Sequence, residues 1–340
     1  MSQPRIAMIA PPWFELPPTA YGGIEAMASD LIEQLTLRGL DITLVGVGRN
    51  GTPADFVPTY DTPNENRLGQ VLPEVTHAAA LTEIIEKIDP DVVHDHSLAG
   101  PLMARGRTVP TVLTAHGPVN GEMGQYYRGL GDSVQLVAVS DAQRRLSPDL
   151  NWVGTVHNAV RVERFPFSED KDDYALFLGR ACREKGIPQA IAAARRAGIH
   201  LKIAAKCREP EEKAYFDREI APLLGDGVEW LGEADRARKV ELLRSARCLV
   251  FPVCWEEPFG IVMVEAMACG TPVVGFRRGS VPEVVTHGRT GYVCDDVESL
   301  ATAIGRVGEL SPHDCRREAE LRFDVDMMAD RYARIYRSVL

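Results

Sequence analysis

Short apolar runs alternate with amphipathic stretches along the first 157 residues. Residues 5–10 (RIAMIA) are almost entirely apolar, as is typical of a strand buried on both faces. Residues 24–38 place Met27, Leu31 and Leu35 at four-residue spacing, which predicts a helix that ends at Gly39. A second helix is predicted at residues 76–88, and further strands at residues 41–48, 91–96, 111–116, 135–140 and 152–157. Strands alternating with helices indicate a doubly wound, mainly parallel α/β sheet.

This pattern stops at residues 164–173 and then begins again. The stretch RFPFSEDKDD is charged, contains Pro166 and has few core-forming residues, so we interpret it as a linker. Further strands are predicted at residues 174–180, 200–205, 228–232, 248–253, 271–276 and 291–295. We therefore expect two α/β domains, residues 1–165 and 166–315, facing each other across a cleft. A C-terminal helix within residues 316–340 is expected to pack back toward the first domain.

Composition narrows the function. The 340 residues can bury two cores, and a net charge of −10 argues against a general nucleic-acid binder, which needs a basic footprint. No run of 18 apolar residues and no signal-peptide pattern occurs, so we expect a cytoplasmic protein without membrane association. The seven cysteines include no C-x-x-C pair, which predicts neither a disulfide framework nor a zinc knuckle.

Two glycine motifs compete as a phosphate-binding loop. Gly46, Gly48 and Gly51 spell G-x-G-x-x-G, but the turn residues after them and the second-strand position argue against a dinucleotide site. Tyr21-Gly22-Gly23 instead follows the first strand and directly precedes a helix. Glycines allow close backbone approach, and a helix N-terminus offers free N–H groups to a phosphate, although two turn glycines would look the same.

The most specific motif is WEEPFGIVMVEAMACGTPVV at residues 255–274. Glu257 and Glu265 are separated by seven residues, and Phe259-Gly260 opens a helix between them. Glu257 is then expected in the loop ahead of the helix and Glu265 about 1.4 turns inside it. Ionised carboxylates accept paired hydrogen bonds from vicinal hydroxyls, so the two acids suit two sugars joined through phosphate.

This run resembles the E-x7-E signature of retaining glycosyltransferases with two Rossmann-like domains (GT-B), especially family 4. The resemblance extends over nearly the whole chain. It includes Tyr-Gly-Gly before the first helix, ThrAlaHisGly at 114–117, ValHisAsnAlaVal at 156–160, LeuGlyArg with Lys185-Gly186, and the block at 279–293. Ala159 replaces a common glycine, and Ala205-Lys206-Cys207 stands where a glycine pair is usual.

The resemblance implies roles for particular residues. The donor would be a nucleoside-diphosphate sugar, with UDP the commonest in the family, and transfer would retain configuration without a metal or other cofactor. Gly22 and Gly23 would cradle the diphosphate, Arg180 and Lys185 would neutralise it, and Lys206 would add a phosphate contact or be exposed. Glu257 would hold donor-sugar hydroxyls, Glu265 the ribose, and His116 would reach the donor sugar. Backbone N–H groups for sugar and phosphate would come from Phe259, Gly260 and Ile261.

Metal-like patterns elsewhere are interpreted as structural. The acids at 89–91 and 324–326 resemble D-x-D motifs but are expected on the surface. In His94-Asp95-His96 the two histidines share one face of a strand, away from the acid, because strand side chains alternate. His96, near the strand end, is a candidate acceptor contact.

The acceptor is expected to bind the first domain. Trp13, Phe14 and Tyr21 in a proline-rich loop form a possible stacking platform, and residues 117–131, with Tyr126, Tyr127 and five glycines, are interpreted as a mobile lid. Residues 1–165 carry 12 Lys+Arg against 19 Asp+Glu. Anionic membranes attract basic clusters, so this acidity favours a soluble saccharide or glycosylated metabolite, such as an antibiotic precursor, over a phospholipid.

Two alternatives stay open from the sequence alone. A nucleotide-sugar epimerase could use the same architecture. It would need acids and a histidine placed for proton transfer at the sugar, and the two-glutamate motif does not indicate such an arrangement. A non-catalytic sugar-binding protein could also have two such domains, and its extracytoplasmic form would need an export signal.

Overall fold

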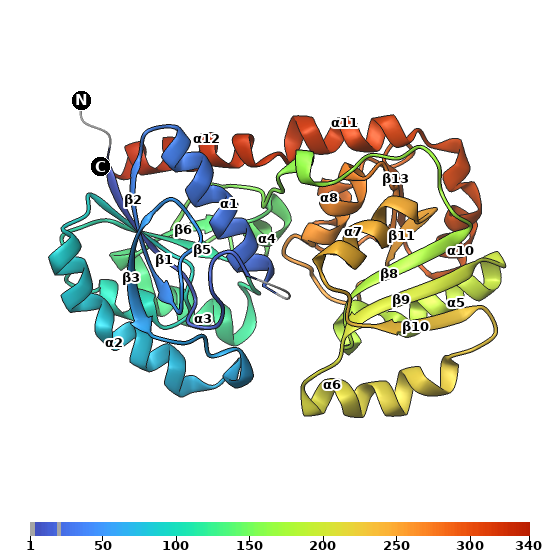
Figure 1. Ribbon diagram of the computed structural model, residues 1–340, viewed down its shortest axis with the longest axis horizontal. Helices are drawn as coiled ribbons and strands as arrows, with labels where there is room; N and C mark the ends of the chain where they lie inside the picture. Colours follow the sequence, from blue (N-terminus) through green and yellow to red (C-terminus); the bar gives the residue numbers. More distant parts are fainter. Residues whose placement is uncertain (1–3, 19–21) are drawn as a thin grey trace. The chain divides into compact units, whose positions relative to one another are not determined.

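The computed structural model describes residues 4–18 and 22–340, and the chain divides into two compact units (Figure 1). Unit 1 comprises Met1–Ala159 and Val325–Leu340, and unit 2 comprises Val160–Asp324. The first division therefore falls at Ala159, earlier than the predicted residue 165. Val160 N–H donates to the Phe323 carbonyl at 3.0 Å, so the incoming chain pairs with the outgoing chain at the start of unit 2.

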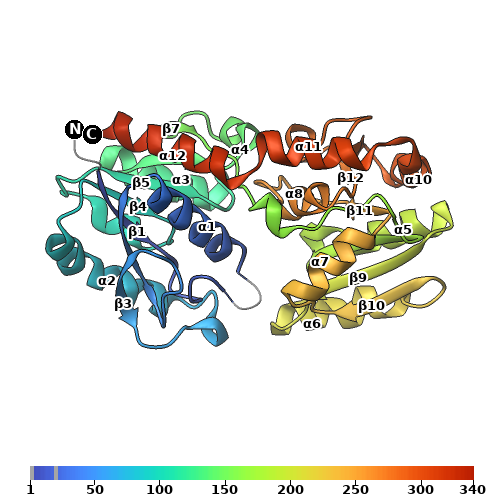
Figure 2. The ribbon, with the colours of Figure 1, turned by 45° about the horizontal axis from the view of Figure 1, so that its top comes forward.

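The predicted C-terminal segment 316–340 is not one element. Helix α11 (Pro312–Arg322) packs on α8 (Ile261–Ala268) in unit 2, whereas α12 (Val325–Val339) packs on α1 (Gly23–Leu37) in unit 1. Figures 1 and 2 both show red α12 running beside blue α1. The expected return to the first domain thus holds for α12 alone, because its apolar face, including Met328, Tyr332 and Tyr336, is buried there.

The described part of unit 1 holds a seven-stranded parallel sheet in the order β3-β2-β1-β4-β5-β6-β7. Its strands are β1 (Arg5–Ile9), β2 (Asp41–Val47), β3 (Asp55–Tyr60), β4 (Val92–Asp95), β5 (Thr111–Ala115), β6 (Gln135–Ala138) and β7 (Trp152–Thr155). The other α-helices in the described part of unit 1 are α2 (Val71–Ile88), α3 (Gly121–Leu130) and α4 (Asp141–Leu146).

Unit 2 repeats this winding in a six-stranded parallel sheet of order β10-β9-β8-β11-β12-β13. Its strands are β8 (Tyr174–Arg180), β9 (His200–Lys206), β10 (Val228–Gly232), β11 (Cys248–Phe251), β12 (Val273–Phe276) and β13 (Gly291–Cys294). The other helices are α5 (Ile187–Ala197), α6 (Pro210–Tyr215), α7 (Arg236–Ser245), α9 (Val281–Val284) and α10 (Val297–Arg306). The predicted doubly wound α/β class is confirmed in both units.

Strand β1 shows why the apolar runs form buried strands. Ile6 and Met8 join the core that contains α1 and α12, whereas Ala7 and Ile9 join the core on the opposite face, which includes Leu81 of α2. Successive side chains of a strand point to opposite faces, so a strand covered on both sides must be apolar at every position.

Two further segments differ from the sequence prediction. Strand β3 was not predicted because DFVPTY has polar residues and Pro58; as the edge strand it tolerates both. The segment expected as a mobile lid contains helix α3 instead. Tyr127 and Leu130 of this helix are buried against β5 and β6 residues, and that burial offsets the weak helix propensity of its glycines.

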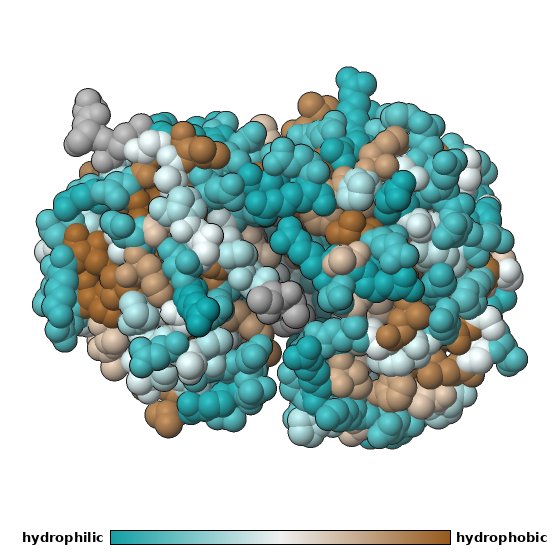
Figure 3. Space-filling model, in the orientation of Figure 1, coloured by the Kyte–Doolittle hydropathy of each residue, from teal (hydrophilic) through white to brown (hydrophobic). Residues whose placement is uncertain are grey.

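The surface drawn in Figure 3 is mainly hydrophilic, and hydrophobic side chains gather in small groups. Over the described residues, no helix combines the length and apolar character that a bilayer crossing requires.

Candidate active site

The predicted site residues lie at the carboxyl edges of the two sheets. In unit 2, Arg180 ends β8 and Glu257 follows β11, and these two strands flank the point where the strand order reverses. In unit 1, His96 directly follows β4 and His116 directly follows β5. Ligands of open α/β sheets bind at such carboxyl edges and switch points, so each unit presents its candidate residues where the fold favours binding.

Glu257 is held as one half of an ion pair. Lys185 Nζ donates to Glu257 Oε2 at 2.6 Å, and the indole Nε1 of Trp255 donates to the same oxygen at 2.8 Å. The lysine side chain is 15% exposed and the glutamate side chain 9%. Glu257 Oε2 accepts both of these hydrogen bonds, and no described residue bonds Oε1. Glu257 therefore keeps one oxygen for a ligand hydroxyl.

Glu265 repeats this arrangement farther along α8. The helix begins at Ile261 after Gly260, which has a φ of 71°, and Glu265 is its fifth residue, as predicted. Lys239 of α7 donates to Glu265 Oε1 at 2.5 Å. Again the second oxygen, Oε2, has no recorded bond within the described chain. The sequence alone does not predict this role for Lys239, because nothing in the α7 sequence shows which helix the lysine faces.

The loop after β12 supports the glutamate loop. The Gly279 N–H donates to Glu256 Oε2 at 2.8 Å, and Ser280 donates through its N–H to Glu257 O and through Oγ to Phe259 O. A Cβ at Gly279, whose φ is 52°, would lie 2.3 Å from Glu257 O. This contact requires glycine and gives a structural reason for the glycine of the 279–293 block.

Gly186 places Lys185 next to the β11 loop in a similar way. Its φ is 73°, and an added Cβ would lie 2.0 Å from the Pro252 carbonyl oxygen. The Cys254 N–H also donates to Glu184 O at 2.7 Å. The close backbone approach brings Lys185 within reach of Glu257, although 71 residues lie between them in the sequence.

The remaining donor candidates of unit 2 differ in exposure. Arg180 is exposed at the end of β8, where it lies opposite Lys206 in the register with β9. Lys206 is only 6% exposed and forms ion pairs with Glu209 and Glu212, the capping residues of α6. The charge of Lys206 is therefore already balanced within unit 2, whereas the sequence predicted either a phosphate contact or an exposed side chain. Phe259 is buried, and Gly260 and Ile261 place backbone N–H groups at the start of α8.

In unit 1, Gly22 and Gly23 lie at the start of α1. Gly22 has a φ of 144° and an added Cβ would lie 2.9 Å from Pro18 Cβ, so glycine is required there; a Cβ at Gly23 would meet nothing. Tyr21 lies outside the described residues. The open backbone at Gly23 is suited to the approach of a phosphate.

Three histidines of unit 1 form a compact cluster. His94 is bonded through Nδ1 to Tyr336 Oη and through Nε2 to Thr114 Oγ1, both at 2.8 Å. His96 Nδ1 lies 2.8 Å from His116 Nε2. Burial lowers the pKa of His94 to about 3 and that of His116 to about 4, and it also lowers the pKa of His96. All three rings are therefore neutral near pH 7.

Gln143 holds the backbone on both sides of His116. Its Nε2 donates to Ala115 O at 2.7 Å and to Gly117 O at 2.8 Å, and its Oε1 accepts from the Val139 N–H at 2.8 Å. This buried glutamine of α4 was missed because an isolated glutamine in a helix carries no sequence signal of such a role.

The acceptor candidates are less exposed than expected. Trp13 is 9% exposed, and the carboxylate of Glu74 beside it accepts from the Leu98 and Ala99 N–H groups. His96 is 5% exposed. Neither side chain forms an open acceptor surface, so these placements differ from the sequence-based expectation. Tyr126 is partly buried and its hydroxyl donates to Leu98 O.

The His94-Asp95-His96 run does not converge on one point. Asp95 Oδ1 accepts from the Ser97 N–H and hydroxyl, whereas both histidines bond residues on the opposite side of the sheet. In the described ranges, no group of three or more histidine, cysteine, aspartate or glutamate side chains is arranged to hold a metal ion.

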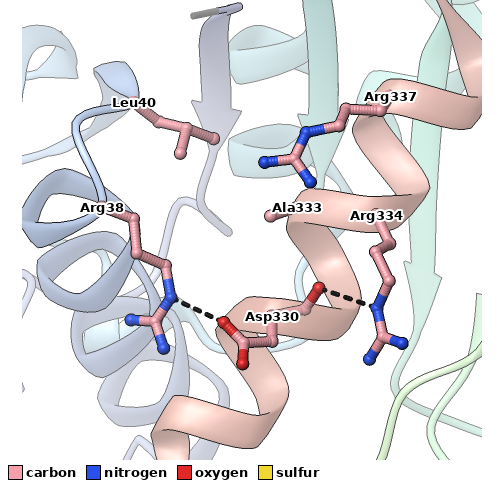
Figure 4. A pocket seen from close by; sticks show the side chains of 6 residues that line it. All are labelled: Arg38, Leu40, Asp330, Ala333, Arg334 and Arg337. Carbon is pink, nitrogen blue, oxygen red and sulfur yellow. Dashed lines mark hydrogen bonds and ion pairs between the residues drawn. The ribbon is translucent and has the colours of Figure 1, made fainter.

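A separate hollow of about 560 Å³ lies in unit 1 between the end of α1 and α12 (Figure 4). Arg38 Nε donates to Asp330 Oδ1 at 2.8 Å, and the Asp330 carbonyl accepts from Arg334 Nε. Leu40 precedes β2, so this hollow is at the amino edge of the sheet, away from His96 and His116. Its lining residues are Arg38, Leu40, Asp330, Ala333, Arg334 and Arg337.

Two family models match the chain. Residues 161–322 match Glycosyl transferases group 1, and residues 21–168 match Glycosyltransferase Family 4. The alpha-maltose-1-phosphate synthase of Mycolicibacterium smegmatis is 30% identical over 87% of this chain and 86% of its own length.

Solved structures extend the similarity to the fold. AviGT4, a glycosyltransferase involved in avilamycin A biosynthesis, superimposes with a TM-score of 0.75 at 25% identity, covering 98% of this chain and 97% of its own. Anabaena Alr3699/HepE, solved with UDP and glucose, has a TM-score of 0.78 at 18% identity, covering 99% and 100%. With its two doubly wound units and these relatives, the chain belongs to glycosyltransferase family 4, the group 1 glycosyltransferases, and is a glycosyl-transfer enzyme of the GT-B fold.

Proposed function

We propose that this enzyme transfers a sugar from a nucleoside-diphosphate sugar, with UDP as the first candidate nucleotide, to a saccharide or glycosylated metabolite, with retention and without a metal. One observation carries the donor assignment. Glu257, in the loop before α8, and Glu265, on α8, are buried carboxylates, and each has one oxygen bonded to a lysine and one that no described residue bonds. Each open oxygen can accept a hydroxyl of a sugar or ribose.

Chemistry at the leaving group follows from the surrounding dipoles and charges. Departure of a nucleoside diphosphate leaves negative charge, which Arg180, Lys185 and the N–H groups at the start of α8 can stabilise. Gly22 and Gly23 add N–H groups at the start of α1. These groups do not require a metal. Family precedent supports retention by front-face attack, with a donor phosphate oxygen taking the acceptor proton.

The acceptor proposal rests on relatives and on charge. The similar enzymes named above make a sugar phosphate or serve avilamycin A biosynthesis, which supports a saccharide or metabolite acceptor. A second acceptor class, one with an apolar part, is favoured by exposed hydrophobic side chains that begin α2 or follow β4. These are Val71, Leu72, Val75, Leu98 and Leu102.

A nucleotide-sugar panel tests the activity. Slow release of nucleoside diphosphate from one donor, unchanged by a chelator, is the expected result. Loss of release after chelation would reject the metal-free mechanism, and absence of both hydrolysis and binding for every donor would reject the transferase proposal. Adding soluble saccharides in one arm and phosphatidylinositol vesicles in the other distinguishes the acceptor classes, and the anomeric configuration of the product, read by NMR, tests retention.

Glu257→Gln tests the donor site directly. The amide keeps the size of the side chain but loses the charge, so we expect donor affinity to fall by about tenfold or more, measured by calorimetry. Glu318→Gln is the matched control, because Glu318 is also buried in unit 2 and paired, with Arg322 at 2.6 Å. Equal donor affinity in the two variants would reject the role of Glu257.

A further inference from the structure

His96 lies between a sulfur atom and a second imidazole. Its Nε2 is 3.1 Å from Met8 Sδ, and its Nδ1 is 2.8 Å from His116 Nε2. Met8 is fully buried on β1 and His96 is 5% exposed. The His96 and His116 rings are nearly parallel, with an interplanar angle of 26°. The three side chains form a chain of polar contacts that enters from the core and ends at His116.

A thioether sulfur has no hydrogen to donate, and a neutral imidazole carries one N–H. If His96 carries its proton on Nε2, that N–H bonds the sulfur and Nδ1 is free to accept. If His96 carries its proton on Nδ1, the Nε2 lone pair faces sulfur lone pairs and a buried acceptor is left unsatisfied, which is costly. Met8 therefore favours the Nε2–H form of His96.

The proton on His96 then decides the proton on His116. Because His96 Nδ1 accepts, His116 Nε2 must donate, and the second nitrogen of His116 carries a lone pair. No group among the described residues bonds His116 Nδ1. We propose that Met8 and His96 are positioning residues that hold His116 in the tautomer whose Nδ1 atom is an open hydrogen-bond acceptor toward a ligand hydroxyl.

The ligand part of this inference rests on the proposed function and on the place that the family resemblance implies for His116, within reach of the donor sugar. An open acceptor selects a hydroxyl at that place and discriminates against a deoxy or O-methyl group, which cannot donate. Burial lowers the pKa values of both rings, so the neutral forms that this scheme needs are present at neutral pH. The Gln143 bonds to Ala115 O and Gly117 O keep the His116 backbone in place.

Nitrogen NMR of the full chain tests the tautomers without any ligand. Histidine is labelled with ¹⁵N, ring signals are assigned with His96→Asn and His116→Asn, and long-range ¹H–¹⁵N spectra show which nitrogen of each ring is protonated. We expect Nε2–H on both His96 and His116. Nδ1–H on His116 would overturn the proposal.

Met8→Leu removes the sulfur but keeps a similar volume. We expect the signals of both rings to move toward tautomer averages, whereas Met328→Leu, a matched buried methionine of α12, leaves them unchanged. Unchanged ring signals in Met8→Leu would also overturn the proposal.

Binding supplies a second readout. With equal tautomer populations in Met8→Leu, the Kd for UDP-glucose should rise about twofold while that for UDP stays the same. Monodeoxy and mono-O-methyl UDP-glucose identify the hydroxyl: one analogue should bind more weakly than UDP-glucose to the wild type, and its deficit should shrink in Met8→Leu. A deficit that stays equal would reject hydroxyl selection. If no nucleotide sugar binds the wild type, the proposed function fails, whereas the NMR result still decides the tautomer inference.

Discussion

Unit 2 holds its two candidate carboxylates as ion pairs, whereas unit 1 holds its clustered histidines as neutral rings. Glu257 and Glu265 are each paired with a lysine. His94 instead bonds the hydroxyls of Tyr336 and Thr114, and His96 bonds His116, so all the partners are neutral. Both arrangements avoid the free-energy cost of burying an isolated charge. Pairing keeps charges available for a charged ligand. Neutralisation instead fixes donors and acceptors, and makes the unit sensitive to acid.

Lys185→Met is expected to give the largest effect. It leaves the Glu257 carboxylate buried with a single neutral donor, Trp255, and removing one partner of a buried pair typically costs about 3–5 kcal/mol. The remaining exposure of the pair places the expected loss near the lower end, about 3 kcal/mol. Urea unfolding measures this loss, and donor turnover should fall with it.

The double variant Lys185→Met/Glu257→Met sharpens the result. With both charges gone, the free energy of unfolding should recover while turnover stays low, because apolar pairs often replace buried ion pairs without loss of stability. A double variant as unstable as the single one would show that the lysine acts through packing rather than charge.

Acid should weaken unit 1 next. Burial lowers the pKa values of His77 and His116 to about 4, that of His94 to about 3, and that of His96. Between pH 6.5 and 4 the unfolded chain binds protons at these four histidines that the folded chain does not, so their contribution to stability falls as pH falls.

Three buried carboxyls act in the opposite direction, and Glu74 is one of them because burial raises its pKa. Burial raises the pKa values of Glu25 and Asp95 to about 7, so between pH 7 and 4 the folded chain binds the extra protons and gains stability as pH falls. Four histidines against three carboxyls leave a net loss of stability of at most about 3 kcal/mol from pH 7 to pH 5. Hydrogen exchange, corrected for intrinsic rates, should show greater opening in unit 1 than in unit 2 at pH 5; equal opening would contradict the comparison.

Gln143→Leu should give an intermediate effect. It removes hydrogen bonds to two carbonyls and one N–H beside His116, at a cost of about 2 kcal/mol in unfolding free energy. Because the histidine backbone is released, kcat/KM should also fall by about tenfold or more. Gln34→Leu is the control: this buried glutamine of α1 bonds Arg38, so its loss should lower stability without lowering kcat/KM.

Lys239→Met should have the smallest effect. Its side chain is 27% exposed, so water compensates Glu265 in part and the expected loss of stability is about 1 kcal/mol. UDP binding should weaken, whereas the response to acid in unit 1 should not change. Thermal shift with and without UDP measures the first, and a changed acid response would show that the two units do not stabilise their sites independently.

The parts of the candidate site that could be predicted are those fixed by residues close together in the sequence. Gly260 and Glu265 are close in sequence, so helix geometry alone placed the second glutamate on the fifth position of α8. Their lysine partners were out of reach of the same reasoning: Lys239 and Glu265 are 26 residues apart and meet only where α7 packs beside α8. The burial of Trp13 was not predicted for a related reason, since the carboxylate beside it, Glu74, belongs to the distant α2.

The sequence by itself determined the alternation of strands and helices, the two α/β units, the glycines that permit close backbone approach, and the two-glutamate motif. These features depend on periodicity and on local backbone freedom, which neighbouring residues specify. Tertiary structure decided that α12 returns to unit 1, that α3 forms where a lid was expected, and how the buried polar groups are partnered. Met8 and His96 are 88 residues apart, and Lys185 and Glu257 are 72. Only the assembled sheets bring such pairs together, and burial then makes each contact decisive for charge and tautomer.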